Sequence, residues 1–70
     1  MYYYELMNKE TLTVETDSNG TITYRNASGQ RHNPNGPAII WHDGSKEYYI
    51  NGKKLTKADF KAWQAQQTAK

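Results

Sequence analysis

Hydrophobic and polar residues alternate along residues 11–16 and again along residues 21–25. Because successive side chains of a β-strand point to opposite faces of the sheet, this period of two predicts two strands. The hydrophobic residues that set the pattern are Leu12, Val14, Ile22 and Tyr24. The last two are expected to point inward. Asn19-Gly20 lies between the two segments and is a strong hairpin signal, so residues 11–25 are predicted to form a β-hairpin.

A loop is predicted over residues 26–37, which are rich in Asn, Ser, Gly and Pro. Two prolines in one stretch argue against a central strand. A loop of this length is long for so small a domain, and long loops often carry function. We interpret it as the connection between two hairpins, with a binding loop as the alternative.

A second hairpin is predicted from residue 38 onward. Residues 38–42 favour a strand, Asp43-Gly44 forms a turn, and residues 46–50 return. The first of these strands holds three large hydrophobic residues in a row, Ile39, Ile40 and Trp41. Such a run predicts burial on both faces or a central position in the sheet. Asn51-Gly52 breaks the returning strand, and residues 53–55 are expected to extend beyond it.

The C-terminal region predicts one amphipathic helix over residues 57–67. Thr56 is a good N-cap, and the Asp59 carboxylate, three residues later, favours the positive end of the helix dipole. Phe60 and Trp63 are three residues apart and therefore share one face of the helix. A helix this short is not stable alone in water, so it is expected to pack on the sheet through these two rings.

The first residues complete the predicted fold. Tyr2 to Met7 is tyrosine-rich and favours a strand, in which Tyr3 and Glu5 lie on the face opposite Tyr2 and Tyr4. The chain is therefore predicted to be α+β. It would have an antiparallel sheet of four or five strands, made of two hairpins and the N-terminal strand, and one C-terminal helix. A single domain over residues 1–70 is expected, with the sheet in residues 1–55 and the helix in residues 56–68.

Composition indicates a small folded domain with a thin core. The chain has 70 residues, 36% of them hydrophobic, and its mean hydropathy is −1.05. Aromatic residues make up 13%, which is more than disordered segments carry. The absence of cysteine excludes disulfides and thiolate metal sites and fits a reducing compartment. No apolar run is long enough to span a membrane, and the N-terminus lacks the features of a signal peptide.

Charge is distributed unevenly along the chain. Residues 1–24 carry one lysine against four acidic residues, whereas residues 25–70 carry eight basic residues against three acidic ones. This asymmetry is compatible with a charged binding face, and a solvated surface of mixed sign is the simpler alternative. The candidate protein-binding residues are Tyr3, Glu5, Glu10, Glu15, Asp17, Arg31 and His32. Lys53, Lys54, Lys57 and Lys61 form the candidate nucleic-acid-binding cluster.

Catalytic and metal-binding motifs are missing from the sequence. His32 and His42 lie ten residues apart without a metal-ligand spacing, and His32 is expected to be a turn residue whose ring bonds the backbone. The serines fall in predicted turns, and the glycines build no phosphate-binding loop. We therefore expect no enzymatic activity, no metal and no cofactor.

Two segments of the chain resemble each other. Gly20 and Gly44 are 24 residues apart, as are Tyr24 and Tyr48, which indicates an internal repeat. The repeated region resembles the MORN-like repeats of many bacterial and bacteriophage proteins. The residues that carry this resemblance are Arg31-His32, Asn35-Gly36-Pro37-Ala38, Asp43-Gly44, Tyr48-Tyr49 and Asn51-Gly52-Lys53. It covers about residues 19–63, with Asn35 standing where such repeats usually have Asp, and one extra residue in the first unit.

The resemblance implies a β-hairpin ladder that serves as a scaffold or binding surface without catalytic residues. We therefore expect a small protein-binding module, of the kind found among bacteriophage accessory proteins. Its partner would be a host enzyme or defence complex that it inhibits, in the manner of anti-CRISPR or anti-restriction proteins, in the bacterial cytoplasm. The alternatives are a nucleic-acid-binding module and a homo-oligomeric structural module that pairs through an edge strand. The chain is expected to be a monomer or a homodimer.

Overall fold

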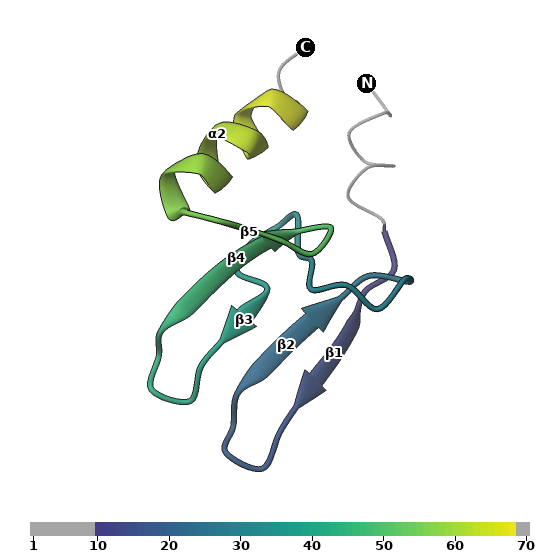
Figure 1. Ribbon diagram of the computed structural model, residues 1–70, viewed down its shortest axis with the longest axis vertical. Helices are drawn as coiled ribbons and strands as arrows, with labels where there is room; N and C mark the ends of the chain where they lie inside the picture. Colours follow the sequence, from purple (N-terminus) through teal and green to yellow (C-terminus); the bar gives the residue numbers. More distant parts are fainter. Residues whose placement is uncertain (1–9, 69–70) are drawn as a thin grey trace.

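The computed structural model describes residues 10–68 and shows a five-stranded antiparallel sheet with one helix after it (Figure 1). The strands follow one another across the sheet in chain order, and every pair of neighbours is antiparallel. The elements are β1 (Thr13–Thr16), β2 (Ile22–Arg25), β3 (Ile39–Ile40), β4 (Lys46–Ile50), β5 (Lys53–Leu55) and α2 (Lys57–Thr68). The predicted α+β class is therefore confirmed. The predicted N-terminal strand over residues 2–7 lies outside the described residues.

The predicted first hairpin is confirmed. β1 pairs with β2 over four residues, from Thr13 opposite Arg25 to Thr16 opposite Ile22. The turn is closed by the Asp17 N–H, which donates to the Thr21 carbonyl at 3.0 Å. Gly20, at φ +93°, takes the left-handed conformation that glycine adopts without steric cost.

The predicted loop over residues 26–37 is confirmed as the connection between β2 and β3, and its first half forms a tight turn. The Asn26 side-chain oxygen accepts hydrogen bonds from the N–H groups of Ser28 and Gln30, each at 3.0 Å. The Asn26 N–H in turn donates to the Gln30 carbonyl at 2.9 Å. These bonds fold residues 26–30 into a tight turn, after which Arg31 pairs with Arg25 of β2. The loop thus begins with a hairpin-like turn. The Asn33 side chain organises its second half, accepting from the Asn35 N–H and donating to the Pro37 carbonyl, each at 3.0 Å.

β3 occupies the centre of the sheet, between β2 and β4, as predicted. Ile39 is only 3% exposed, and the preceding Ala38 is fully buried. Burial on both faces, the other expectation for this strand, is not found, because Trp41 is 39% exposed and Ile40 is partly exposed. Trp41 lies beyond the end of β3, where the Trp41 N–H already donates to the Ser45 carbonyl in the next turn.

The strand register sorts the side chains onto two faces. Residues that lie opposite each other in neighbouring strands share a face, and the next residue along each strand lies on the other. We call one of them the apolar face; it carries Val14, Ile22, Tyr24, Ile40, Tyr48 and Leu55. The opposite one, the charged face, carries Glu15, Thr23, Arg25, Ile39, Glu47, Tyr49 and Lys54.

The predicted helix and its cap are confirmed. The Asp59 N–H donates to the Thr56 hydroxyl at 3.0 Å, as an N-cap requires. Phe60 is 3% exposed and packs against Tyr48 of the apolar face, with ring centroids 4.8 Å apart. Trp63 stacks beside Phe60 at 6.1 Å. The helix therefore packs on the sheet through Phe60, with Trp63 stacked on that ring, and its main contacts are with β4 and β5.

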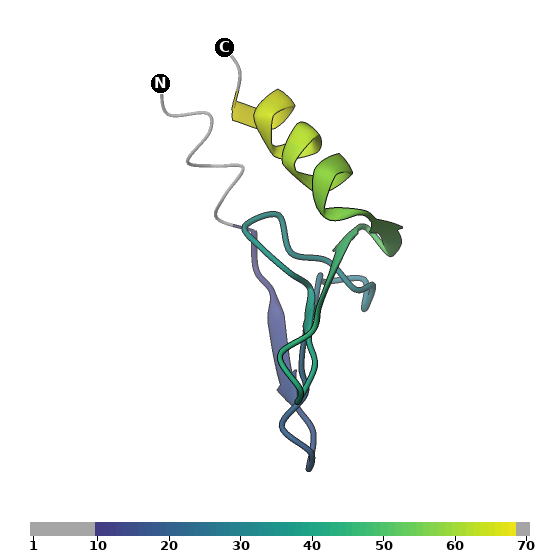
Figure 2. The same cartoon turned by 90° about the vertical axis from the view of Figure 1, so that its left-hand side faces the viewer.

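The helix covers only one end of the sheet. In two perpendicular views α2 lies beyond the end of the strands opposite the β1–β2 and β3–β4 turns, and those turns project away from it (Figures 1 and 2). Among the described residues, the buried hydrophobic ones are Ala38, Ile39 and Phe60. Four polar residues are buried with them: Thr21, Asn26, His32 and Asn33. The core is thus thin, as the composition predicts, and part of it is a hydrogen-bonded polar network.

The internal repeat has a structural counterpart. Gly20 and Gly44 both adopt φ +93°, and Gly29 and Gly52 both adopt φ +84°. The turn that contains Gly29 has three central residues, whereas β4 and β5 are joined by only Asn51-Gly52, both at positive φ. This difference accounts for the one extra residue in the first unit.

Candidate interaction surfaces

Part of the apolar face is left open. The open apolar patch consists of Val14, Ile22, Tyr24 and Ile40. Val14 is 55% exposed and the other three are partly exposed. Val14 lies opposite Tyr24, and Ile22 lies opposite Ile40, so the four side chains form a continuous surface across three strands. Aromatic and β-branched residues pair well across strands, so these contacts help to stabilise the pairing of β1, β2 and β3.

The charged face is occupied by interactions within the chain. The Glu47 carboxylate accepts hydrogen bonds from the Trp41 ring N–H and the Tyr49 hydroxyl, both at 3.0 Å. The Lys54 amine lies 3.9 Å from the same carboxylate. The Arg31 guanidinium stands over the Tyr49 ring, 5.7 Å from its centroid. This face therefore has fewer unsatisfied groups to offer a partner than its charge suggests.

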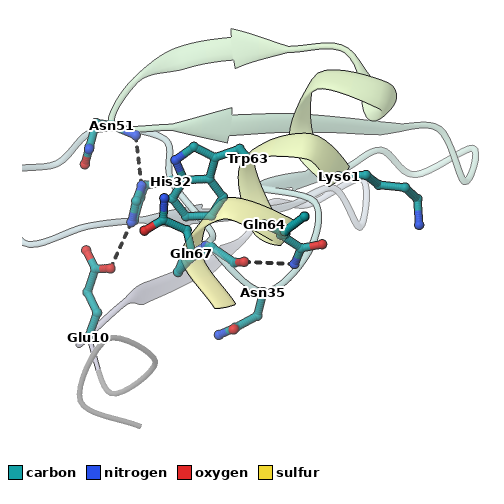
Figure 3. A pocket seen from close by; sticks show the side chains of 10 residues that line it. Glu10, His32, Asn35, Asn51, Lys61, Trp63, Gln64 and Gln67 are labelled. Atoms are coloured by element: carbon teal, nitrogen blue, oxygen red, sulfur yellow. Dashed lines mark hydrogen bonds and ion pairs between the residues drawn. The ribbon is translucent and has the colours of Figure 1, made fainter. Parts of the chain in front are cut away.

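A buried histidine ties three segments together (Figure 3). His32 is 4% exposed; the Asn51 main-chain N–H donates to its Nδ1 at 2.8 Å, and its Nε2 lies 2.9 Å from Glu10 Oε1. Because a main-chain N–H can only donate, Nδ1 carries no proton, and Nε2 donates to the carboxylate. The expected backbone hydrogen bond of His32 is confirmed. Since both ring nitrogens are engaged, accepting a substrate proton would cost His32 one of these bonds.

An open cleft lies beside this histidine, with a volume of about 720 Å³. Its lining is Glu10, His32, Pro34, Asn35, Asn51, Lys61, Trp63, Gln64, Ala65 and Gln67. The Gln64 side-chain amide donates to the Pro34 carbonyl at 3.0 Å, which joins the helix wall of the cleft to the loop wall (Figure 3). Within residues 10–68, no group of three His, Cys, Asp or Glu side chains is arranged to hold a metal ion.

The structure distributes the predicted protein-binding residues over several surfaces. Glu10 bonds His32 beside the cleft, whereas Glu15 forms an ion pair with Arg25 at 3.0 Å on the charged face. The Asp17 carboxylate accepts hydrogen bonds from two N–H groups of its own turn. Arg31 stands over Tyr49. Tyr3 and Glu5 lie outside the described residues. The described members therefore do not form one contact surface.

The four predicted nucleic-acid-binding lysines are all exposed, but they divide between two hollows. Lys61 lines the cleft beside His32. Lys54 and Lys57 line a second groove, near the β3–β4 turn, together with Trp41 and Lys46. Lys53 lines neither. The lysines that are close in sequence thus make no single patch.

Sequence reasoning missed the open apolar patch as a site. The alternation along residues 11–16 was a sufficient signal for a strand, but it does not say whether anything covers that strand. The useful additional signal is that the sequence predicts one helix for four or five strands. A helix is about 10 Å across and strands are about 4.8 Å apart, so one helix covers about two strands.

Comparisons with protein-family models, with curated proteins and with solved structures found no match for this chain. The resemblance to MORN-like repeats therefore stays a prediction that depends on the motif residues alone. In the part of the chain that the structure describes, no helix combines the length and apolar character needed to cross a bilayer.

Proposed function

We propose that this chain is a non-catalytic protein-binding module that uses the open apolar patch as its contact surface. The observation that carries this proposal is the exposure of Val14, at 55%, within a continuous group of three further hydrophobic side chains. Contiguous apolar surface on a small soluble domain is a common mark of protein interaction sites. The polar residues of the charged face, by contrast, already bond one another.

The border of the patch indicates the chemistry of the partner. Lys46 lies opposite Ile40 on the apolar face and is exposed, and Thr16 borders Ile22 on the other side. A matching partner segment would place hydrophobic side chains on Ile22, Tyr24 and Ile40 and an acidic side chain near Lys46. The family resemblance suggests that the partner is a bacterial enzyme or defence complex, which the bound module would inhibit.

The test is affinity capture from bacterial lysate with matched variants on the two faces. Ile40→Thr places a hydroxyl in the patch, whereas Thr23→Ser makes a similarly small change on the charged face. The proposal expects one stoichiometric partner that the wild type and Thr23→Ser retain, that Ile40→Thr binds at least tenfold more weakly, and whose activity falls on binding. A partner that Ile40→Thr retains fully, or no partner at all, would overturn it, provided that melting curves show each variant folded.

Nucleic-acid binding is a second candidate because of the groove near the β3–β4 turn. That groove combines the partly exposed Trp41 ring with Lys46, Lys54 and Lys57. Stacking on an aromatic ring and contact of lysines with phosphates are the usual means of single-strand binding. Fluorescence anisotropy with a labelled single strand should show affinity that falls with salt and is lost in Lys54→Gln/Lys57→Gln. Equal loss in the control Lys53→Gln/Lys61→Gln would show non-specific attraction instead.

A further inference from the structure

The outer edge of β1 has main-chain groups available for pairing. Asp17 bonds Thr21 across the first hairpin, so the odd-numbered residues of β1 direct their N–H and C=O groups toward β2. The groups of Val14 and Thr16 therefore point away from the sheet. β1 is the last strand on its side, and no strand among residues 10–68 pairs with that edge.

This edge lacks the features that usually prevent sheets from pairing with one another. Natural edge strands are protected by lysine, proline, bulges or inward-pointing charges. Residues 11–16 contain neither lysine nor proline, and the pairing of β1 with β2 is regular. The only charge in the segment, Glu15, lies on the charged face and forms an ion pair with Arg25.

We propose that two copies of this chain form a homodimer by antiparallel pairing of their β1 strands about a two-fold axis at Val14. The two five-stranded sheets would then join into one continuous sheet. In this register Val14 lies opposite its own copy, Leu12 opposite Thr16, and Thr13 opposite Glu15. No like charges face each other across the junction. This inference goes beyond the proposed function and does not depend on it.

The neighbouring registers differ in the side chains that they bring together. An axis at Glu15 would place two Glu15 carboxylates opposite each other, and like charges directly opposite are destabilising. An axis at Thr13 would pair Leu12 with Val14 and suits the outward main-chain groups equally well; in that register Thr13→Cys, and not Val14→Cys, would cross-link. An axis at Thr16 would place Glu15 opposite Asp17, and like charges directly opposite are destabilising. An axis at Leu12 would place Val14 opposite Glu10, whose carboxylate already bonds His32. The proposal takes Val14 rather than Thr13 as the axis because the two Val14 side chains, each 55% exposed in one copy, would then cover each other.

Pairing at Val14 would also cover the most exposed hydrophobic residue of the patch. The side chains of both Val14 residues and the two Tyr24 rings would lie on one face of the joined sheet, because paired strands keep their side-chain alternation. The two open apolar patches would thus become one surface that spans the junction. A two-fold interface of this kind is self-complementary by symmetry.

Light scattering over a range of concentrations tests the dimer. The wild type should reach twice the mass of one chain. Val14→Lys brings two lysines face to face and should raise the midpoint of dimer formation at least tenfold. The matched control, Thr13→Lys, places its lysine opposite Glu15 and should leave the midpoint unchanged or lower it. A wild type that stays monomeric at millimolar concentration, or equal effects of both variants, would overturn the proposal.

Cross-linking tests the register. The chain has no cysteine, so each variant carries a single thiol. Directly opposed residues of an antiparallel pair have Cα atoms about 5.5 Å apart, within the range of a disulfide. Val14→Cys should therefore cross-link on mild oxidation, whereas Thr16→Cys, which faces Leu12, should not. Preferential cross-linking at Thr16 would contradict the register. A monomer whose Val14 and Thr16 amides resist hydrogen exchange would show that another segment occupies the edge, which would overturn the dimer.

Discussion

The two sides of the sheet, β4–β5 and β1–β2, differ in how far their apolar face is covered. At the β4–β5 end, Phe60 of α2 packs against Tyr48, Trp63 stacks beside Phe60, and a His32 hydrogen bond fastens the adjoining turn. At the β1–β2 end, Val14 is 55% exposed, and Ile22, Tyr24 and Ile40 are partly exposed. The same apolar face thus serves folding at one end and remains available for binding at the other. The contrast shows that the alternating pattern of a strand predicts an apolar face. It does not predict whether a helix of the same chain or a partner protein covers that face.

The largest expected difference between the two ends is in stability. Phe60→Ala removes the most buried ring and should lower the free energy of unfolding by about 3–5 kcal/mol. A domain of this size has a total stability of about 4–10 kcal/mol, so the variant should be partly unfolded. Val14→Ala, at the open end, should cost less than about 0.5 kcal/mol, since most of that side chain is already in water. Urea unfolding of both variants measures the difference, and similar losses would contradict the contrast.

The His32 bonds should have the next largest effect. His32→Ala leaves the Asn51 N–H without its acceptor and should lower the free energy of unfolding by about 1–3 kcal/mol. Glu10→Gln is the matched control, because its side-chain oxygen can still accept from Nε2. Chemical denaturation measures both changes. If Glu10→Gln destabilised the protein as much as His32→Ala, the carboxylate charge rather than the hydrogen bonds would hold these segments together.

The helix cap comes third. Thr56→Ala removes the acceptor for the Asp59 N–H and should cost about 1 kcal/mol, because that donor is then left without its partner at the helix start. Thr56→Ser keeps the hydroxyl and should stay within a few tenths of a kcal/mol of the wild type. Thermal melting followed by circular dichroism compares the two. A loss in the serine variant equal to that in alanine would show that the threonine methyl group, and not the cap, matters.

The smallest effect is expected at the exposed β3–β4 turn. The Ser45 main-chain N–H and then its hydroxyl bond the Asp43 carboxylate and hold its pKa below the ordinary value of 3.8. A lowered pKa in the folded state means that this contribution is present above pH 3.8 and is lost as the pH falls through the folded value. A carboxyl titration by NMR should therefore give Asp43 a pKa below 3.8, rising toward 3.8 in Ser45→Ala. A pKa at or above 3.8 in the wild type would contradict this turn geometry.

The sequence predicts the local elements well because their signals are local. The Asp17–Thr21 hairpin, the cap at Thr56 and the ring pair Phe60 and Trp63 each depend on residues within a few positions of one another. The tight turn over residues 26–30, inside the predicted loop, does not follow from composition, because Asn, Ser and Gly favour both turns and open loops. Only the position of the Asn26 side-chain oxygen, which accepts two N–H groups, decides between them.

The candidate site is less predictable than the fold, because it depends on which side chains the rest of the folded chain leaves uncovered and unbonded. Glu15, Asp17 and Arg31 were chosen for their charge, but each is engaged within the chain by a partner that sequence spacing alone does not identify. Trp41 was expected inside because it follows two isoleucines, yet it lies beyond the strand end and is 39% exposed. The open patch depends on where α2 packs on the sheet, and that is set by tertiary contacts rather than by local sequence.

The comparison of Ile40→Thr with Thr23→Ser in partner capture tests the central claim most directly. Both residues lie in neighbouring central strands, one on each face of the sheet. If the apolar patch is the binding surface, the bound partner is lost from Ile40→Thr and retained by Thr23→Ser, while both variants melt as folded proteins. Retention of the partner by Ile40→Thr together with its loss from Thr23→Ser would place binding on the charged face and contradict the account.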